Sequence, residues 1–360
     1  MSHSGVYDMA GNAKEWCWNA LESNRYIMGG AWNEPAYMFG ALDALPPFDR
    51  SPTNGLRCAR YLSPEKLPKA ATDPIKLRYQ RDYKREQPVS DAIFTAYKSL
   101  YRYDKTALNP RVELVDDKDP RWRKEKVTFN AGYGNERMIT FLFVPKHGIP
   151  PYQAVIYFPG AYALGLRSSQ HLDLDLFFDF ILKSGRAVIY PIYKSTYERG
   201  DGLSFDQQDT SNLYRDHVIQ WSKDLGRTID YVETRTDLDN KKIAYYGLSW
   251  GAALGGLLPA LDDRIKVIAV VGGGLWLARA LAEVDPINFA PRIRVPVLMV
   301  NGRYDALLPM DLSQDPMFCL LGTPDRDKRH AVFESGHIPP KNLVRKEVLD
   351  WLDRYLGSIN

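Results

Sequence analysis

Ser249 is the central residue of a Gly-Leu-Ser-Trp-Gly motif, a pattern that can present a hydroxyl for nucleophilic attack. A strand-like run at residues 242–246 precedes the motif, and a small-residue helical stretch at 252–256 follows it. This context predicts a tight, strained turn between a strand and a helix, in which side chains at the flanking glycines would collide with the neighbouring backbone. The turn would lift the hydroxyl clear of the sheet, and the helix N-terminus would favour developing negative charge. Ser249 is therefore the candidate nucleophile.

A hydroxyl is a weak nucleophile at neutral pH, so the motif predicts a carboxylate and a histidine later in the chain. Asp305 lies just beyond the apolar run at residues 295–300, and His337 lies in the loop after residues 331–333. Both follow the C-terminal ends of predicted strands, at the same edge of the sheet as Ser249, where an open α/β sheet places its site. The three residues have the order and context of a catalytic triad.

Other histidines and acidic residues are weaker candidates. His330 precedes the last predicted strand, and His217 falls inside a long predicted helix, which favours a surface or packing role. Asp311 and Asp315 lie past the candidate acid, in a predicted helix. Glu334 is the best alternative acid, but it is too close in sequence to the candidate histidine to span the usual gap.

A tetrahedral intermediate of acyl transfer needs two backbone N–H donors. The first is expected from Trp250, immediately after the nucleophile. The second is expected from the loop at residues 159–165, where Ala161 is the preferred donor and Tyr162 the next. This loop occupies the position of a His-Gly-Gly-Gly or His-Gly oxyanion loop but lacks its histidine.

Bulky side chains are expected to line the entrance of the acyl pocket and to leave little depth for a long chain. The candidates are Tyr162, Trp250 and Trp276. An ordinary, partly buried role for Tyr162 is an equal alternative. The segment at residues 271–291 is expected to form either a cap over the pocket or a helix that packs on the sheet.

Composition excludes several other classes of protein. The 360 residues are 45% hydrophobic and 25% charged, which is typical of a globular protein. The net charge of +3 is spread without blocks of one sign, so the basic face of a nucleic-acid binder is not expected. The three cysteines, Cys17, Cys58 and Cys319, are too few and too widely spaced for a disulfide framework or a Cys-rich zinc site.

The sequence also carries no signal for export or for a membrane. The first residues lack a basic n-region and an apolar h-region, and the longest apolar stretch, residues 267–278, is too short to span a bilayer. We therefore expect a cytoplasmic protein, although the chain could be a fragment of a longer one. We expect no cofactor, because there is no His-Glu-x-x-His, P-loop or Rossmann glycine motif.

The chain divides into regions of different character. Residues 1–62 are rich in Gly, Trp, Asn and Pro and predict turns joined by short extended pieces, and residues 63–110 predict a charged connector with a helix near 92–101. Residues 111–360 alternate strand and helix signals, and this predicts a mostly parallel α/β sheet with helices on both faces. The expected strands are 111–116, 126–130, 137–144, 154–158, 187–192, 243–246, 267–271, 295–300 and 331–333. The expected helices are 171–184, 207–233, 251–261 and 342–355.

With these motifs, residues 111–360 resemble the α/β-hydrolase superfamily, near its acetyl xylan esterase, dienelactone hydrolase and prolyl-oligopeptidase-like branches. The resemblance covers about two thirds of the chain, and its motifs are specific to the superfamily but not to a substrate. Dienelactone hydrolases use cysteine where this chain has Ser249, so the resemblance disfavours that activity.

Residues 1–62 resemble the C-terminal third of the formylglycine-generating (sulfatase-modifying factor) fold. The resemblance rests on the segment at 5–16, the Gly-Gly-Ala-Trp turn at 29–32 and the segment at 54–60. The catalytic cysteine pair of that family would fall at residues 43–52, which contain no cysteine. The resemblance therefore implies a truncated, inactive remnant that packs against the hydrolase. So short a segment cannot bury its many aromatic residues within itself, so we expect the remainder to be buried against the hydrolase domain. These residues are Tyr7, Trp16, Trp18, Tyr26, Trp32, Tyr37 and Phe39.

The leading hypothesis is a serine esterase for short-chain esters, in which His337 activates Ser249 and Asp305 orients the imidazole. A small-molecule ester is then the expected partner. One alternative is a peptidase of the prolyl-oligopeptidase-like kind. Another is a non-catalytic sensor or interaction module, because in bacteria segments resembling residues 1–62 occur between signalling kinases and hydrolase domains.

Overall fold

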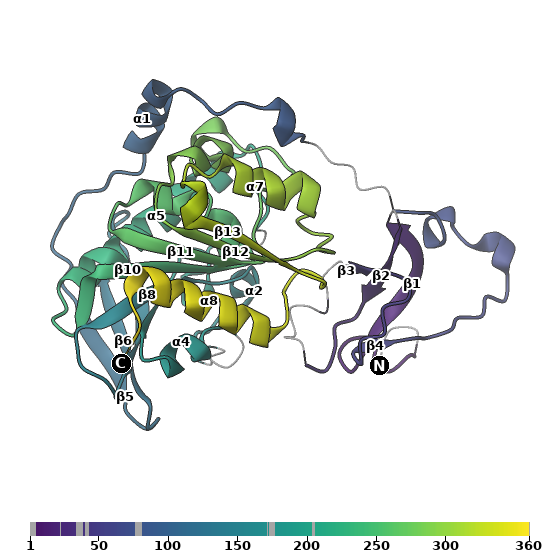
Figure 1. Ribbon diagram of the computed structural model, residues 1–360, viewed down its shortest axis with the longest axis horizontal. Coiled ribbons are helices and arrows are strands. Elements are labelled where there is room, and N and C mark those ends of the chain that lie inside the picture. Colours follow the sequence, from purple (N-terminus) through teal and green to yellow (C-terminus); the bar gives the residue numbers. More distant parts are fainter. Residues whose placement is uncertain are drawn as a thin grey trace.

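The computed structural model describes residues 5–359 except 22, 34–38, 40–42, 76–80, 171, 173–176 and 204–205. The described chain forms a small four-stranded sheet, in the order β3-β2-β1-β4, and a large nine-stranded sheet, in the order β13-β12-β11-β10-β8-β9-β7-β6-β5. In Figure 1 the small sheet lies to the right, beyond the tips of β12 and β13.

The large sheet has the two halves that the sequence predicts. Its first strands, β5 (Arg111–Asp116), β6 (Trp122–Asn130) and β7 (Arg137–Pro145), are antiparallel to one another. The other strands are β8 (Tyr152–Phe158), β9 (Ala187–Ile192), β10 (Leu238–Leu248), β11 (Ile265–Val271), β12 (Val297–Gly302) and β13 (Lys328–Phe333). These six are parallel to their neighbours within the group, while β9 is antiparallel to β7. The prediction of an α/β fold is confirmed.

Helices cover both faces of the large sheet because alternate residues of each buried strand point to opposite sides. Ile156 and Phe158 of β8 lie in one apolar core, whereas Val155 and Tyr157 lie in the other. The first core is covered by α5 (Asn212–Glu233), α1 (Asp91–Ser99) and α7 (Asp315–Leu320), and the second by α4 (Asp179–Lys183) and α8 (Lys341–Leu356). Figure 1 shows these two sets above and below the sheet.

Two predicted helices differ from the structure. The stretch at 251–261 divides into α6 (Trp250–Leu254) and a 3-10 helix (Leu258–Leu261), because the intervening Gly-Gly pair and Pro259 disfavour a continuous α-helix. The predicted helix at 171–184 falls partly outside the described residues, and its described part is the short α4. A further short helix, α2 (Tyr162–Gly165), follows β8.

The predicted connector is partly built into the main core. Tyr83, Phe94 and Tyr101 are buried there, and the rings of Phe94 and Tyr101 pack edge-on against Phe289, with centroids 5.4 and 5.6 Å away. The Tyr83 hydroxyl donates a hydrogen bond to the carbonyl oxygen of Trp276. The second half of the connector therefore packs as part of the α/β unit, while the boundaries 1–62, 63–110 and 111–360 stay predictions.

The small sheet is more regular than the predicted turns and short extended pieces. Its strands are β1 (Lys14–Leu21), β2 (Asn24–Met28), β3 (Asp43–Leu45) and β4 (Asn54–Gly55). β1 pairs with β2 in antiparallel and with β4 in parallel orientation. Tyr26 and Ala44 of this sheet pack with Ala306 of the large unit.

The expectation that the aromatic residues of residues 1–62 are buried is wrong for several of them. Tyr7, Trp18 and Trp32 are 66%, 72% and 70% exposed, while Tyr26 is buried. Tyr37 lies outside the described residues. Among the described residues, the buried apolar contact between the two units is the small cluster of Tyr26, Ala44 and Ala306.

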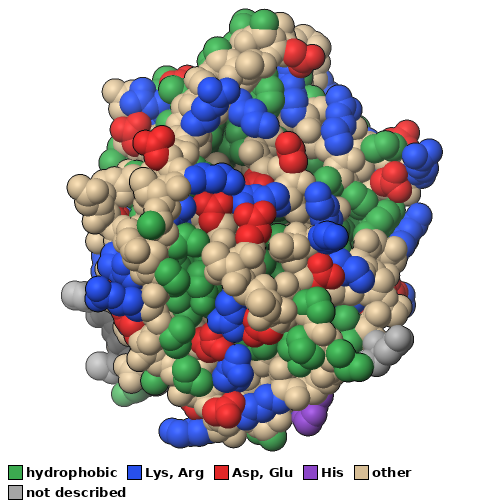
Figure 2. Space-filling view, turned by 90° about the vertical axis from the view of Figure 1, so that its left-hand side faces the viewer, with side chains coloured by type: hydrophobic (Ala, Val, Ile, Leu, Met, Phe, Trp, Pro, Cys, Tyr) green, Lys and Arg blue, Asp and Glu red, His purple; other side chains and the backbone are tan. Residues whose placement is uncertain are grey.

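On the face shown in Figure 2, Lys and Arg side chains are interspersed with Asp and Glu. Among the residues that the structure describes, no helix combines the length and apolar character that a bilayer crossing needs.

Candidate active site

The turn at Ser249 joins the end of β10 to the start of α6. Ser249 has φ of +51°, a conformation that non-glycine residues rarely adopt. A Cβ added to Gly247 would lie 2.4 Å from the carbonyl oxygen of Gly251, and one added to Gly251 would lie 2.3 Å from that of Phe158. Both glycines are therefore required for the turn to pack against the sheet.

A continuous chain of hydrogen bonds joins the three predicted residues. The Ser249 hydroxyl oxygen lies 2.8 Å from Nε2 of His337, and Nδ1 of His337 lies 2.7 Å from Oδ2 of Asp305. A carboxylate can only accept from Nδ1–H, so Nε2 of the neutral imidazole is left as the acceptor that faces the serine hydroxyl. The arrangement is suited to removing the serine proton.

The acid is held in place by its own loop. Oδ1 of Asp305 accepts hydrogen bonds from the backbone N–H groups of Leu307 and Leu308, at 2.9 and 3.0 Å. Its other oxygen is thereby directed at the imidazole. Two backbone donors and one imidazole donor satisfy a carboxylate that is only 3% exposed.

Burial and charge act in opposite directions on His337. Ser249 and His337 are 7% and 3% exposed, so the imidazole has little contact with water. Burial lowers the pKa of His337, but the charge and hydrogen bond of Asp305, followed by the charges of Asp43 and Asp206, raise it, and the net direction is upward. The site therefore favours the imidazolium that forms when the serine is deprotonated.

The weaker candidates lie elsewhere. His330 is within β13, near Asp315, and His217 of α5 contacts Asp201. Glu334 forms an exposed ion pair with Arg303.

The two segments expected to supply backbone donors lie side by side. A Cβ added to Gly160 would lie 3.6 Å from Cβ of Ser249, and the N–H of Gly251 donates to the carbonyl oxygen of Pro159. Trp250 is the first residue of α6, where no earlier helical turn supplies an acceptor for its N–H. The donor roles of Trp250, Ala161 and Tyr162 stay predictions.

Two of the three bulky residues predicted at the pocket entrance have buried side chains. The Trp250 indole is fully buried, with edge-on contacts to Phe158 and Trp221 at centroid distances of 4.9 and 4.8 Å. Trp276 is 4% exposed and packs in an apolar cluster with Ala253. Their place at a pocket entrance therefore stays a prediction.

Tyr162 is the predicted entrance residue that stays beside the nucleophile. A Cβ on Gly160 would meet both the Tyr162 ring, at 3.2 Å, and Ser249. The ring stacks on Phe177, with centroids 5.4 Å apart, and its hydroxyl oxygen lies 3.3 Å from that of Tyr157. These contacts hold the aromatic ring next to the strand-to-helix turn at Ser249, which we call the elbow.

Two acidic residues near His337 were missed by the sequence analysis. Asp43 of β3 accepts a hydrogen bond from the backbone N–H of His337 across a separation of 294 residues. Asp206 is partly buried, and its charge acts on the His337 imidazole. No motif surrounds either residue, so local sequence offered no signal for them.

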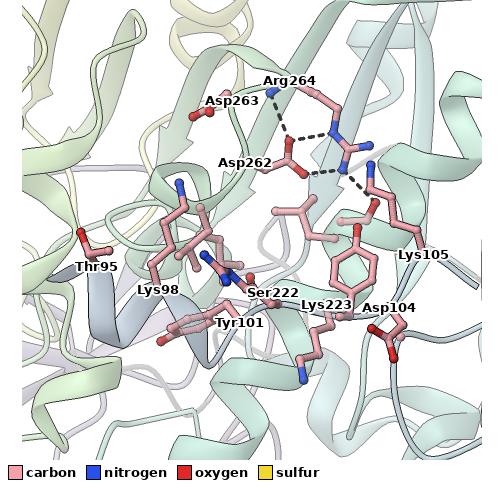
Figure 3. A pocket seen from close by; sticks show the side chains of 17 residues that line it. Thr95, Lys98, Tyr101, Asp104, Lys105, Ser222, Lys223, Asp262, Asp263 and Arg264 are labelled. Atoms are coloured by element: carbon pink, nitrogen blue, oxygen red, sulfur yellow. Dashed lines mark hydrogen bonds and ion pairs between the residues drawn. The ribbon is translucent and has the colours of Figure 1, made fainter.

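A cavity of about 810 Å³ lies away from this site (Figure 3). It is lined by charged residues such as Lys98 and Lys223, together with Asp262–Arg264, which immediately precede β11. This is the N-terminal edge of the parallel strands, whereas Ser249, Asp305 and His337 follow their C-terminal ends. The triad lies at the opposite edge, where α/β sheets carry their sites.

Within the described part of the chain, no group of three or more His, Cys, Asp or Glu side chains is placed to hold a metal ion.

The comparisons with solved structures identify the class of fold. The chain is similar to an acetyl xylan esterase from Paenibacillus sp. R4, with 17% identity, a TM-score of 0.57 and coverage of 78% of this chain and 100% of that one. It is also similar to acetyl xylan esterase 1 from Thermoanaerobacterium sp. JW/SL YS485, with 16% identity, a TM-score of 0.59 and coverage of 78% and 99%. A cold-adapted esterase from an Arctic intertidal metagenomic library matches with 15% identity, a TM-score of 0.51 and coverage of 69% and 99%. The large unit has the α/β-hydrolase fold.

The N-terminal resemblance is confirmed separately. The family model of the sulfatase-modifying factor enzyme 1-like domain matches residues 1–62. The residues that match this family model thus precede the unit with the α/β-hydrolase fold.

Proposed function

We propose that this protein is a serine carboxylesterase that hydrolyses short-chain esters. The observation that carries the proposal is the hydrogen-bonded series Ser249–His337–Asp305, with a strained serine at a strand-to-helix turn. A hydrolase fold alone does not define chemistry, since one fold hosts many functions. The geometry of these three side chains supports acyl transfer.

In the proposed mechanism, Ser249 Oγ attacks the ester carbonyl carbon while His337 Nε2 takes the serine proton. The resulting oxyanion accepts hydrogen bonds from the N–H of Trp250 and from that of Ala161 or Tyr162. His337 then gives its proton to the alkoxide leaving group, and an acyl-serine remains. Water attacks this ester with His337 as base, and the proton returns to Ser249 as the free acid leaves.

Asp305 acts through the imidazole. Its carboxylate keeps the proton of the resting imidazole on Nδ1 and stabilises the imidazolium by charge. The two backbone N–H bonds to Asp305 hold the carboxylate in that direction.

The expected acyl group is small. Ser249 is only 7% exposed, and the fixed ring of Tyr162 lies beside it. Two of the similar solved structures are described as acetyl xylan esterases, and this supports an acetyl or similar group here too.

The proposal is tested by measuring hydrolysis of p-nitrophenyl acetate by the full chain and by Ser249→Ala. We expect turnover by the wild type and a loss of at least about a thousandfold in the variant, with an unchanged melting temperature. An acetylated sugar and an aminoacyl amide, tested in parallel, separate an esterase from a peptidase. Retention of more than a few per cent of activity in the alanine variant would reject Ser249 as the nucleophile.

A further inference from the structure

Asp43 connects the small sheet directly to the proposed catalytic residues. In the small sheet its backbone pairs with Ile27 of β2. On its other side it forms an isolated antiparallel bridge with Asp305. Its side-chain Oδ1 accepts a hydrogen bond from the backbone N–H of His337, at 3.3 Å. One residue of the N-terminal segment therefore contacts both the acid and the histidine of the site.

The Asp43 carboxylate is deeply buried for a charged group. The residue is 3% exposed, and its Oδ2 lies 3.7 Å from Nζ of Lys14, which is itself 8% exposed. Burying a carboxylate costs free energy unless charge and hydrogen bonds offset it. The small sheet supplies the charged partner, Lys14, and the histidine loop supplies the hydrogen-bond donor, the N–H of His337.

The histidine loop is shaped to receive this side chain. A Cβ added to Gly336 would lie 2.6 Å from Oδ1 of Asp43, which is closer than real Cβ contacts allow. Only glycine at the position before His337 lets the carboxylate reach the backbone there. The contact thus depends on matching residues in two segments that are distant in sequence.

We infer that Asp43 is a positioning residue of the catalytic site, which holds the backbone of His337 and adds negative charge beside its imidazole. The inference rests on the proposed esterase function. It assigns residues 1–62 a part in the chemistry and replaces the expectation that this segment is a catalytically inert remnant.

The charges that face His337 come from several elements. Asp305 follows β12, Asp43 belongs to β3, and Asp206 lies in the loop before α5. Burial raises the pKa of the Asp43 carboxyl, whereas the charge of Lys14 of β1 acts in the opposite direction and favours the carboxylate form. During acylation the imidazole becomes an imidazolium, so each carboxylate lowers the energy of the charged form. Removing the charge of Asp43 alone should make His337 easier to deprotonate.

The test compares three variants of the full chain. Asp43→Asn removes the charge but can keep an acceptor oxygen, Asp43→Ala removes both, and Glu15→Gln removes one charge from the same sheet without touching His337. The measurements are kcat and KM for p-nitrophenyl acetate as functions of pH, the melting temperature, and the titration of the His337 imidazole by nitrogen-15 NMR.

For Asp43→Asn we expect the acid limb of kcat/KM and the His337 titration to move together to lower pH. For Asp43→Ala we expect kcat to fall by about ten- to a hundredfold, because a shift of about 1 Å in a catalytic group can cost that much. KM should change little, and Glu15→Gln should match the wild type in every readout. If Asp43→Ala does not fold, Asp43→Asn still decides the inference.

The inference is overturned if Asp43→Asn keeps the wild-type acid limb and the wild-type His337 titration. A change in melting temperature alone, without movement of either titration, would likewise reduce Asp43 to a structural role and overturn it. Failure of the proposed function looks different, because the wild type would then hydrolyse no ester. In that case the NMR titration still shows whether Asp43 acts on His337.

Discussion

Gly302 and Gly336 pack backbone against backbone, so that a Cβ on Gly302 would lie 1.7 Å from the carbonyl oxygen of Gly336. Gly302 ends β12, just before the loop of Asp305, and Gly336 immediately precedes His337. Their contact brings the two loops together at the distance that the hydrogen bond between Asp305 and His337 needs. The acid and the histidine are therefore positioned by two residues that have no side chain.

Gly302→Ala is expected to separate these loops. The added methyl group would clash with the backbone of Gly336. We therefore expect a loss of about 1–3 kcal/mol in the free energy of unfolding and a large loss of ester turnover. Gly165→Ala is the matched control, because nothing lies within 4 Å of a Cβ at that position. Thermal unfolding and p-nitrophenyl acetate hydrolysis of both variants provide the measurement. Wild-type turnover in Gly302→Ala would show that the two loops move independently.

The partners of Ser249 should be as sensitive as the serine itself. We expect His337→Ala to lower kcat by at least about a thousandfold and Asp305→Asn to lower it severely, because both act on the same proton transfer. His217→Ala and His330→Ala should keep near wild-type turnover per folded molecule, since neither contacts Ser249. A comparable loss from His330→Ala would contradict the assignment of the base.

The pH dependence of turnover should follow His337. The general base works only in its neutral form, so kcat/KM falls as the pH drops through its pKa. Burial lowers the pKa of His337, but Asp305, Asp43 and Asp206 raise it to a net value above the ordinary 6.5. We therefore expect the acid limb of kcat/KM for p-nitrophenyl acetate to have its midpoint above pH 6.5. A midpoint clearly below that value would mean that burial outweighs the carboxylates.

Acyl length should be limited by the ring of Tyr162. Because this ring is stacked on Phe177 and lies beside the elbow, we expect acetyl to butyryl esters to be preferred over decanoyl esters by about tenfold or more. Rates on p-nitrophenyl esters of increasing length measure the preference. Tyr162→Ala should extend the range toward longer chains. A wild-type maximum at octanoate or beyond would show that the Tyr162 ring does not limit acyl length.

The core behind the elbow should be intolerant of truncation. Trp221 is fully buried, packs edge-on against Trp250, and donates its indole N–H to the carbonyl oxygen of Lys194 at 2.9 Å. We expect Trp221→Ala to lower the free energy of unfolding by about 3–5 kcal/mol. Trp18→Ala, at a residue that is 72% exposed, should change it by less than about 0.5 kcal/mol. Denaturant unfolding of the two variants tests the contrast, and equal effects would contradict the burial of Trp221.

Much of the α/β unit could be predicted because its signals are local. An alternating pattern gave β5 (Arg111–Asp116) and a continuous apolar run gave β9 (Ala187–Ile192), both with their observed bounds. The other strands of the large sheet were found with shifted ends. The elbow and the chain order of serine, acid and histidine are also local or ordinal features. The position of a residue after a strand is enough to assign it to one edge of a parallel sheet.

The small sheet and the connector could not be predicted in this way. The pairing of β1 with β4 joins residues that are far apart in sequence, and the short strands have no clear alternation of their own. The connector is rich in charged residues, so its composition did not predict that a few of its aromatic side chains enter the core. Their burial depends on a surface that the α/β unit supplies.

By itself, the sequence determined the fold class, the strained serine turn and the edge of the sheet at which Asp305 and His337 lie, because strand period and chain order carry that information. Only the tertiary structure decided which way each side chain points and what stands behind it. It placed the Trp250 indole edge-on against Trp221 in the apolar core, and it brought Asp43 against the backbone of His337. Such contacts depend on close approaches between segments that are distant in sequence. Glycines such as Gly336 make these approaches possible, but no local sequence pattern predicts them.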